Sequence, residues 1–176
     1  MTLDYTLVQL VDDDGTPLRT VPKASVHGTE TPLHLAFSCH VEDGEGRVLV
    51  TRRALTKATW PGVWTNSFCG HPAPGEPVED AVRRRAREEL GLEIEALTPI
   101  LPDFRYRAVD ASGLVENEIC PVFRAQAVGE PAPSSDEVCE WEWTTPERLR
   151  AAVVAAPYAF SPWLRLQLQQ LGLASL

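Results

Sequence analysis

The fold is decided by the stretch GHPAPGEPVEDAVRRRAREELGL, residues 70–92. Apolar residues recur at helical spacing from Val78 to Leu90, and Gly91 is a natural C-terminal stop, so this part predicts a helix. The loop from Gly70 to Gly75 leads into the N-terminus of that helix, where backbone N–H groups favour negative charge. The stretch therefore predicts a loop and a helix that together can hold an anion.

One carboxylate, that of Glu89, lies on the apolar side of the predicted helix. At about 100° per residue, one narrow sector holds Val78, Val82, Ala86 and Glu89. A carboxylate in that position needs a partner, which is either Arg85 one turn earlier or a metal ion. We favour a metal for Glu89, and we expect Arg84 and Glu88, on a different face, to form an ion pair at the surface.

The spacing in this stretch resembles the Nudix box, G-x5-E-x7-R-E-U-x-E-E-x-G-U, in which U is an aliphatic residue. The matching residues are Gly70, Glu76, Arg84, Ala86, Glu88, Glu89, Gly91 and Leu92. One position departs, because Arg85 stands where the box has a glutamate. In Nudix hydrolases the acidic residues of the box hold metals and help to activate water on a diphosphate. Arg85 inverts the local charge, which favours binding a diphosphate that is left intact.

The rest of the chain predicts more strands than helices. Strand-like runs span Tyr5–Val11, Leu33–Val41, Arg47–Thr51, Val63–Phe68, Phe104–Val109, Leu114–Phe123 and Val138–Trp143. Pro121 predicts an edge or a bulge at the end of the sixth run, and residues 129–135 predict a surface loop. Two further helices begin after Thr145 and Ser161. We expect one α+β domain over residues 1–176: a Nudix-like mixed β-sheet flanked by helices, with extra N-terminal strands and C-terminal helices.

Length and composition exclude several classes of protein. A chain of 176 residues with 44% hydrophobic and 23% charged residues predicts one folded domain. Its net charge of −9 argues against nucleic-acid binding, and no run approaches the roughly 18 apolar residues of a membrane span. The N-terminus shows no signal segment, so we expect a cytoplasmic protein. We also expect a monomer. The four cysteines form no C-x-x-C pair, which argues against a zinc ribbon or a disulfide framework.

Three histidines and two glutamates form a second group of candidate site residues. Glu116 and Glu118 stand at i and i+2, so a strand directs both carboxylates to one face, where a cation relieves their repulsion. With His27, His34 and His71 they make a plausible set of ligands for Mn²⁺, Mg²⁺ or Zn²⁺. For each histidine taken alone, a surface or hydrogen-bonded role is the alternative.

Seven stretches outside the helix resemble the type I isopentenyl-diphosphate isomerases, metal-dependent enzymes built on a Nudix-like fold. They are Thr31–Ser38, Thr51–Ala54, Trp60–Ser67, Cys69–Pro72, Phe104–Arg107, Val115–Glu118 and Ser161–Trp163. These stretches follow the order of the family across nearly the whole chain. The family also departs from the hydrolase box at the position of Arg85, so that residue favours the resemblance.

The resemblance implies two metals and a set of site residues. One divalent metal would be bound by His27, His34, His71, Glu116 and Glu118. A Mg²⁺ that travels with the substrate diphosphate would be held by Glu89 and the main-chain carbonyl of Cys69. The residues implied to bind the diphosphate are Lys23, Arg53, Lys57 and Arg85. The implied catalytic pair is Cys69 and Glu118.

The implied reaction is a reversible 1,3-allylic proton shift between isopentenyl diphosphate and dimethylallyl diphosphate, through a tertiary carbocation. It requires an acid and a base on the substrate; we expect Glu118 with Tyr106 to donate the proton and Cys69 to act as base. Trp163 is suited to cation–π contact with the carbocation. Without the resemblance, Trp163 is better interpreted as a core residue that anchors the last helix, and Cys69 as a small buried hydrophobic residue.

Two other functions compete with this one. A Nudix hydrolase of a nucleoside diphosphate derivative is disfavoured by Arg85 and by the metal ligands outside the box. A Nudix-like module that binds a phosphorylated ligand without catalysis has no need for Cys69, Tyr106, Glu116 and Glu118 together.

Overall fold

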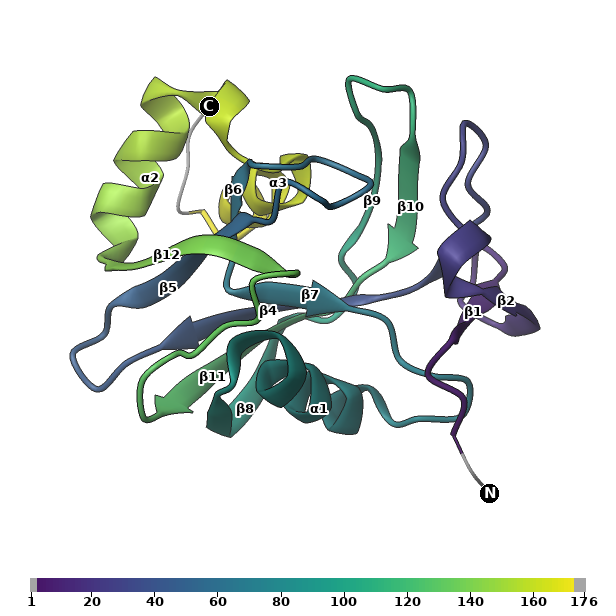
Figure 1. Cartoon of the computed structure of the whole chain (residues 1–176), viewed down its shortest axis with the longest axis horizontal. Helices are drawn as coiled ribbons and strands as arrows, with labels where there is room; N and C mark the ends of the chain where they lie inside the picture. The colour runs from purple at the N-terminus through teal and green to yellow at the C-terminus, as the bar shows by residue number, and fades with distance from the viewer. Residues whose placement is uncertain (1–2, 173–176) are drawn as a thin grey trace.

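The computed structural model describes residues 3–172, which fold into two β-sheets and three α-helices (Figure 1). The first sheet has the strand order β2-β1-β3-β10-β9. Its strands are β1 (Leu7–Val11), β2 (Pro17–Pro22), β3 (His34–Leu35), β9 (Arg105–Val109) and β10 (Val115–Ile119). A 3₁₀ helix, η1 (Lys23–Ser25), follows β2 and carries the first basic residue of the site.

The second sheet has the order β12-β5-β4-β11-β8, with β6 paired to β5 and β7 paired to β4. Its strands are β4 (Phe37–Glu42), β5 (Val48–Arg53), β6 (Trp64–Thr65), β7 (Phe68–Gly70), β8 (Glu93–Leu101), β11 (Val122–Val128) and β12 (Val138–Thr144). The predicted mixed sheet is therefore the larger of two sheets, and it contains the parallel pair β4–β11.

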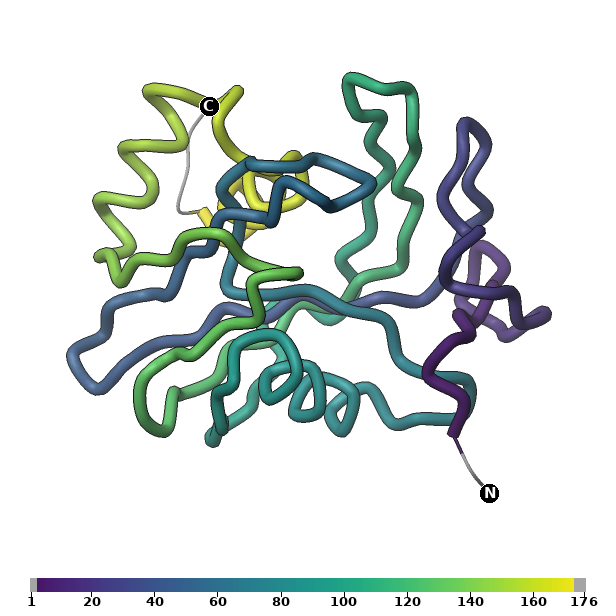
Figure 2. Tube along the Cα trace, viewed as in Figure 1, coloured from purple at the N-terminus to yellow at the C-terminus, as the bar shows by residue number. Residues whose placement is uncertain are grey.

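Two segments pass from one sheet into the other, side by side and in parallel (Figure 2). In the first, β3 and β4 are separated by Ala36; in the second, β10 and β11 are separated by Cys120 and Pro121. The sequence predicted each segment as one strand, because each forms one uninterrupted strand-like run. The break comes from the change of sheet. β11 lies between β4 and β8, so Pro121 marks no sheet edge, although the register of β11 with β8 shifts at Val122.

Two other differences concern strands that the sequence pattern describes poorly. The predicted strand Val63–Phe68 is two short strands, because Asn66 and Ser67 turn inward and hydrogen-bond to main-chain groups of neighbouring strands. Strand β8 was not predicted at all. Most of its side chains are exposed without strict alternation, and Ala96 interrupts it with a positive φ of 50°.

The helices lie on both sides of the larger sheet (Figure 1). α1 (Val78–Leu90) has the predicted bounds and packs Val82, Ala86 and Leu90 against Phe37 and Phe68. α2 (Pro146–Ala155) and α3 (Pro162–Gln170) begin at the predicted caps Thr145 and Ser161, and they cover the opposite face. A second 3₁₀ helix, η2 (Pro157–Ala159), joins them. Strand β5 serves both cores, because Leu49 faces the α1 side and Val48 and Val50 face the other.

Gly91 ends α1 in the left-handed region, with φ 59°, and no other residue fits this position. A Cβ there would lie 2.6 Å from the carbonyl oxygen of Ala132. Its N–H and that of Leu92 cap the helix on Arg87 and Ala86. Among residues 3–172 no helix is long and apolar enough to cross a membrane.

Candidate active site and metal centre

The pairing of three strands places the central residues of the site in one row. His34 of β3 lies opposite Glu118 of β10, and Glu118 lies opposite Tyr106 of β9. Glu116 lies two positions from Glu118 and is buried on the same face, as the i, i+2 spacing predicted. The two sheets therefore bring together residues that lie far apart in the sequence.

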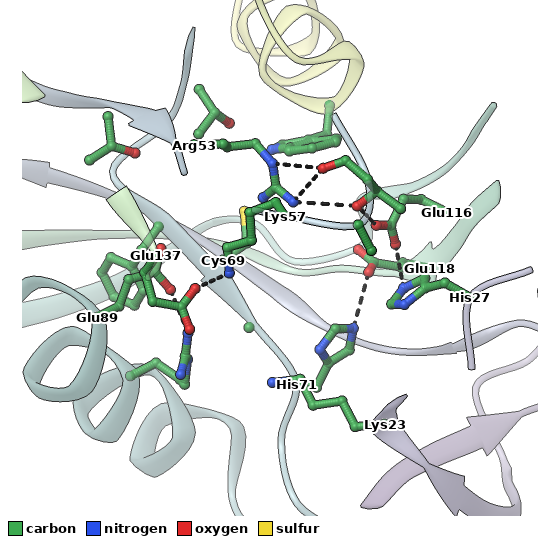
Figure 3. Close-up of a pocket in the computed structure, with 18 of the residues that line it drawn as sticks. Lys23, His27, Arg53, Lys57, Cys69, His71, Glu89, Glu116, Glu118 and Glu137 are labelled. Carbon is green, nitrogen blue, oxygen red and sulfur yellow. Dashed lines mark hydrogen bonds and ion pairs between the residues drawn. The ribbon is translucent and has the colours of Figure 1, made fainter. Parts of the chain in front are cut away.

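Three imidazoles and a carboxylate meet at this row. Ligand atoms of His27, His34, His71 and Glu118 all lie within 4.8 Å of one another. Glu116 completes the group, since its Oε2 lies 2.7 Å from His27 Nε2 (Figure 3). All five predicted ligands of the first metal are thus brought together.

The orientation of these side chains fits a divalent metal ion. Buried polar atoms without a hydrogen-bond partner include Nε2 of His27, Nε2 of His34 and Oε2 of Glu116. Nδ1 of His34 lies 2.9 Å from the carbonyl oxygen of Pro32, so its proton is held there and Nε2 carries the free lone pair. Buried lone pairs that converge without donors are costly unless a cation binds them.

The protonation of the group also suits metal binding. Burial lowers the pKa of His71 to about 4, so this ring is neutral near pH 7. Burial acts to raise the pKa of Glu118, but the close contacts of its carboxylate with the rings of His34 and His71 outweigh it and hold that pKa well below its usual range. Burial acts to lower the pKa of His34, but Glu118 outweighs it and raises that pKa, so a metal ion competes with a proton at His34 and not at His71.

Thr59 orients one of the carboxylates from outside the ligand group. Its hydroxyl donates to Glu116 Oε1 at 2.7 Å, which leaves Oε2 turned toward His27. Sequence reasoning did not single out this residue, because a threonine in a loop carries no distinguishing signal. Its role follows only from the contact.

We expect Thr59→Val to weaken metal binding about 10- to 100-fold, because Glu116 loses the donor that fixes its orientation. Titration calorimetry with Mn²⁺ measures this directly. The matched control is Thr51→Val, which removes an equally buried hydroxyl that bonds only to the main-chain oxygens of residues 66 and 67. Equal affinities in the two variants would exclude an orienting role for Thr59.

A cavity of about 240 Å³ joins the metal-ligand group to a cluster of basic side chains (Figure 3). The predicted diphosphate residues Lys23, Arg53, Lys57 and Arg85 all line it. So do two acidic residues, Glu89 and Glu137. The cavity therefore offers a strongly polar surface of both signs, suited to an anion that carries its own cation.

Arg85 and Lys57 are held by these acidic residues. Arg85 Nη2 donates to Glu89 at 2.6 Å and to Glu137 at 3.2 Å, and Lys57 Nζ also contacts Glu137. The sequence left two partners open for Glu89, Arg85 or a metal ion, and the structure contains the ion pair with Arg85. Metal binding by Glu89 stays a prediction. Glu137 was missed, since it stands between a predicted loop and a predicted strand with no motif around it.

Arg84 is engaged more deeply than the predicted surface pair. It does contact Glu88, at 3.1 Å, but two of its nitrogens also donate to the two oxygens of the buried Glu76, each at 2.8 Å. Glu76 accepts from the N–H of Ala73 as well. The first glutamate of the motif thus ties the loop 70–75 to the helix, and the prediction of a surface pair alone was incomplete.

Arg53 is the last residue of β5, and its side chain is held by the loop that follows this strand. It donates to the carbonyl oxygens of Thr59 and Trp60 and lies over the ring of Trp163, 5.4 Å from its centroid. Trp60 has a positive φ of 43°, a conformation that these contacts hold in place. Diphosphate binding by Arg53 stays a prediction. Lys23 is another of the basic residues predicted to bind the diphosphate, and burial is the main cause that lowers its pKa.

The residues predicted to act on the substrate's carbon skeleton all line the same cavity: Glu118, Cys69, Tyr106 and Trp163. The thiol of Cys69 lies 3.2 Å from Ser38 Oγ, and burial raises its pKa to about 12. Burial also raises the pKa of Tyr106 well above its usual value. Trp163 is only 3% exposed and its ring packs 5.8 Å from that of Tyr106, so it is a core residue and a lining residue at once.

Comparison with known proteins identifies the family. A family model described as NUDIX domain matches residues 32–164. A protein of Leifsonia xyli subsp. xyli named isopentenyl-diphosphate Delta-isomerase is 63% identical over 170 residues, which cover 96% of this chain and 92% of that protein. The chain belongs to the isopentenyl-diphosphate Delta-isomerase family. A Clavibacter michiganensis member of this isomerase family is 64% identical over 92% of this chain and 84% of its own.

Solved structures agree on the fold. A Deinococcus radiodurans protein has a TM-score of 0.73 at 21% identity, covering 93% of this chain and 98% of that one. A MutT protein of Methanosarcina mazei has a TM-score of 0.64 at 19% identity, over 81% and 95% of the two chains. At these identities only the fold is shared. Both the isomerase family and the Nudix fold predicted from the sequence are confirmed.

Proposed function

We propose that this member of the isomerase family interconverts isopentenyl diphosphate and dimethylallyl diphosphate by a metal-dependent 1,3-allylic proton shift. The observation that carries the proposal is one cavity lined both by a cationic cluster and by Cys69, Glu118, Tyr106 and Trp163. A diphosphate bound at the cations would place its five-carbon chain in the same cavity as these groups. We place the enzyme in the cytoplasm and propose that it acts as a monomer.

The diphosphate is held by charge. Lys23, Lys57 and Arg85 bind its oxygens, and Arg53 supports them from the loop that it fixes. When the diphosphate enters with Mg²⁺, Glu89 and the carbonyl of Cys69 are the ligands that we propose for that ion. Arg85 then exchanges its contacts with Glu89 and Glu137 for contacts with the diphosphate.

The three histidines and two glutamates would hold a second divalent cation, Mn²⁺, Mg²⁺ or Zn²⁺, whose positive charge would strengthen the Glu118 carboxyl as an acid. The ligand residues are His27, His34, His71, Glu116 and Glu118. Their buried atoms without partners support this assignment.

The proton shift needs a strong acid and a base on one substrate. Glu118, with Tyr106 opposite it on β9, and Cys69 are the groups in the cavity that can exchange protons with carbon. We assign Glu118, with Tyr106, as donor to the terminal methylene carbon. The positive charge falls on C3, Cys69 takes a proton from C2, and the C–H electrons form the new C2=C3 bond. In the site without metal or substrate, Glu118 is the anion and Cys69 is the thiol, so a proton must pass from Cys69 to Glu118 before the step.

The carbocation is shielded by aromatic surface. Trp163 presents its ring to the cavity, with Tyr106 beside it and Trp60 at 5.4 Å. A positive charge without hydrogen-bonding groups is stabilised by such π faces and by nearby carboxylates. The same rings exclude water, which would otherwise capture the cation as an alcohol.

The deciding experiment follows isopentenyl diphosphate in D₂O with Mg²⁺ and Mn²⁺, by proton and phosphorus NMR on one sample. We expect dimethylallyl diphosphate that carries deuterium, with the diphosphate intact. Release of phosphate would support a hydrolase instead. Unchanged spectra, together with ligand-induced stabilisation of the protein, would support a module that binds without catalysis.

Lys57 is expected to set an alkaline limit on this reaction. Burial is the main cause that lowers its pKa to about 8, so the ammonium that binds diphosphate is lost as the pH rises through that value. We expect kcat/KM to fall above about pH 8, and the fall to move to higher pH in Lys57→Arg, because a guanidinium keeps its charge. A pH profile of kcat/KM for both proteins tests this. An identical alkaline limb in Lys57→Arg would assign the limit to another group.

A further inference from the structure

A buried chain of hydrogen bonds leads from the thiol of Cys69 away from the cavity. Cys69 of β7 lies opposite Ser38 of β4 in the register of the sheet, and their side-chain atoms are 3.2 Å apart. Gln167 of α3 donates from Nε2 to Ser38 Oγ at 2.9 Å, and Gln167 Oε1 lies 2.9 Å from His40 Nε2. Ser38 and Gln167 are fully buried, and His40 is 7% exposed.

The order of donors and acceptors along this chain fixes where the Ser38 proton points. His40 donates to the oxygen of Gln167, so the amide nitrogen of Gln167 faces Ser38 and donates to it. Ser38 must then direct its own proton to another acceptor. The acceptors within reach among residues 3–172 are two sulfurs, those of Cys69 at 3.2 Å and Cys120 at 3.5 Å. Cys69 is the closer.

The opposite side of the Cys69 sulfur is fixed as well. Its S–H donates to Asn66 Oδ1 at 3.4 Å. The amide nitrogen of Asn66 donates to the carbonyl oxygens of residues 39 and 68, so the side chain of Asn66 has only one orientation. Trp163 Nε1 donates to the same oxygen at 3.0 Å. The sulfur thus lies between a fixed donor and a fixed acceptor.

We infer that Ser38, oriented by Gln167, is a positioning residue that holds the Cys69 sulfur at the cavity by a directed hydrogen bond. This inference rests on the proposed function, since it assumes that Cys69 exchanges a proton with the substrate. Ser38 and Gln167 do not line the cavity, so neither residue touches the substrate. They affect where the sulfur lies during proton transfer, so their loss is expected to lower kcat and to leave KM unchanged.

The first test compares Ser38→Ala with wild type. We expect kcat to fall roughly 10-fold, with KM unchanged, because about one directed hydrogen bond is lost. The matched control is Ser67→Ala, which removes a fully buried hydroxyl that bonds only to main-chain groups of residues 41 and 49. That control is expected to lower the melting temperature and to leave kcat of the folded enzyme unchanged.

A combined variant separates positioning from simple stability. Ser38→Ala leaves the Gln167 donor buried without a partner, whereas Ser38→Ala combined with Gln167→Met and His40→Phe removes all three polar groups and restores part of the melting temperature. If Ser38 positions the thiol, kcat stays low in the combined variant. Recovery of kcat together with melting temperature would overturn the inference, as would an unchanged kcat in Ser38→Ala.

Failure of this inference differs from failure of the proposed function. If the wild-type protein yields no deuterated dimethylallyl diphosphate, the proposed function fails and the inference with it. If the wild type turns over and Ser38→Ala does so at the same kcat, the function stands and only the role of Ser38 is rejected.

Discussion

Replacement of Cys69 by alanine is expected to abolish turnover and to leave diphosphate binding nearly unchanged. The thiol lines the cavity but is not one of the cations that hold the diphosphate. Loss of one proton-transferring group costs about 10²- to 10⁴-fold in rate. The measurements are kcat by proton NMR and the affinity for inorganic diphosphate with Mg²⁺ by calorimetry.

The control for this variant is Cys39→Ala. Cys39 is also a buried thiol, but it belongs to the core between β4 and α1 and does not line the cavity. It is expected to cost stability without changing kcat of the folded protein. If Cys69→Ala keeps turnover within tenfold of the control, Cys69 is not part of the catalytic pair.

Glu118→Gln is expected to cause an equally large loss of turnover and to weaken metal binding in addition. Its carboxylate lies 3.5 Å from His34 and 3.3 Å from His71, so it serves the metal-ligand group. In the proposed mechanism it also carries the proton. An amide can neither bind the cation as an anion nor transfer the proton, and we expect a loss of about 10³-fold or more in kcat.

Glu116→Gln separates the two roles of Glu118. Glu116 is placed to bind the same metal but is assigned no proton transfer, so it is expected to lose metal affinity and to recover activity at high Mn²⁺. Activity is measured across a Mn²⁺ titration, with metal content determined by atomic emission. Recovery of Glu118→Gln to wild-type activity under the same titration would reduce Glu118 to a metal ligand.

Much of the site follows from the sequence because short-range patterns encode it. The i, i+2 spacing of Glu116 and Glu118 places both on one face of a strand, and helical periodicity places Glu89 on the buried side of α1. Family resemblance supplied what spacing alone left open, above all the joining of His27, His34 and His71 into one group. The structure brings every predicted site residue to one cavity or its ligand group.

The residues that were missed act through contacts that no local pattern records. Glu137 and Thr59 lie in loops, and their importance comes from Arg85, Lys57 and Glu116, which approach them from other elements. The change of sheet at Ala36 was missed for a similar reason. A strand that leaves one sheet and enters another has the same alternation as a strand that does not.

The parallel crossing of the two segments from one sheet to the other bears on how the enzyme matures. His34 and Glu118 become neighbours through the pairing of β3 with β10, which joins segments far apart in the sequence, and such long-range pairings are slow to form. The metal-ligand group is therefore a product of complete folding rather than a nucleus for it. Metal added to the unfolded chain would find no preformed site, whereas metal added to the native protein raises its stability by mass action. We therefore expect metal binding to stabilise the native state after folding and not to speed folding itself.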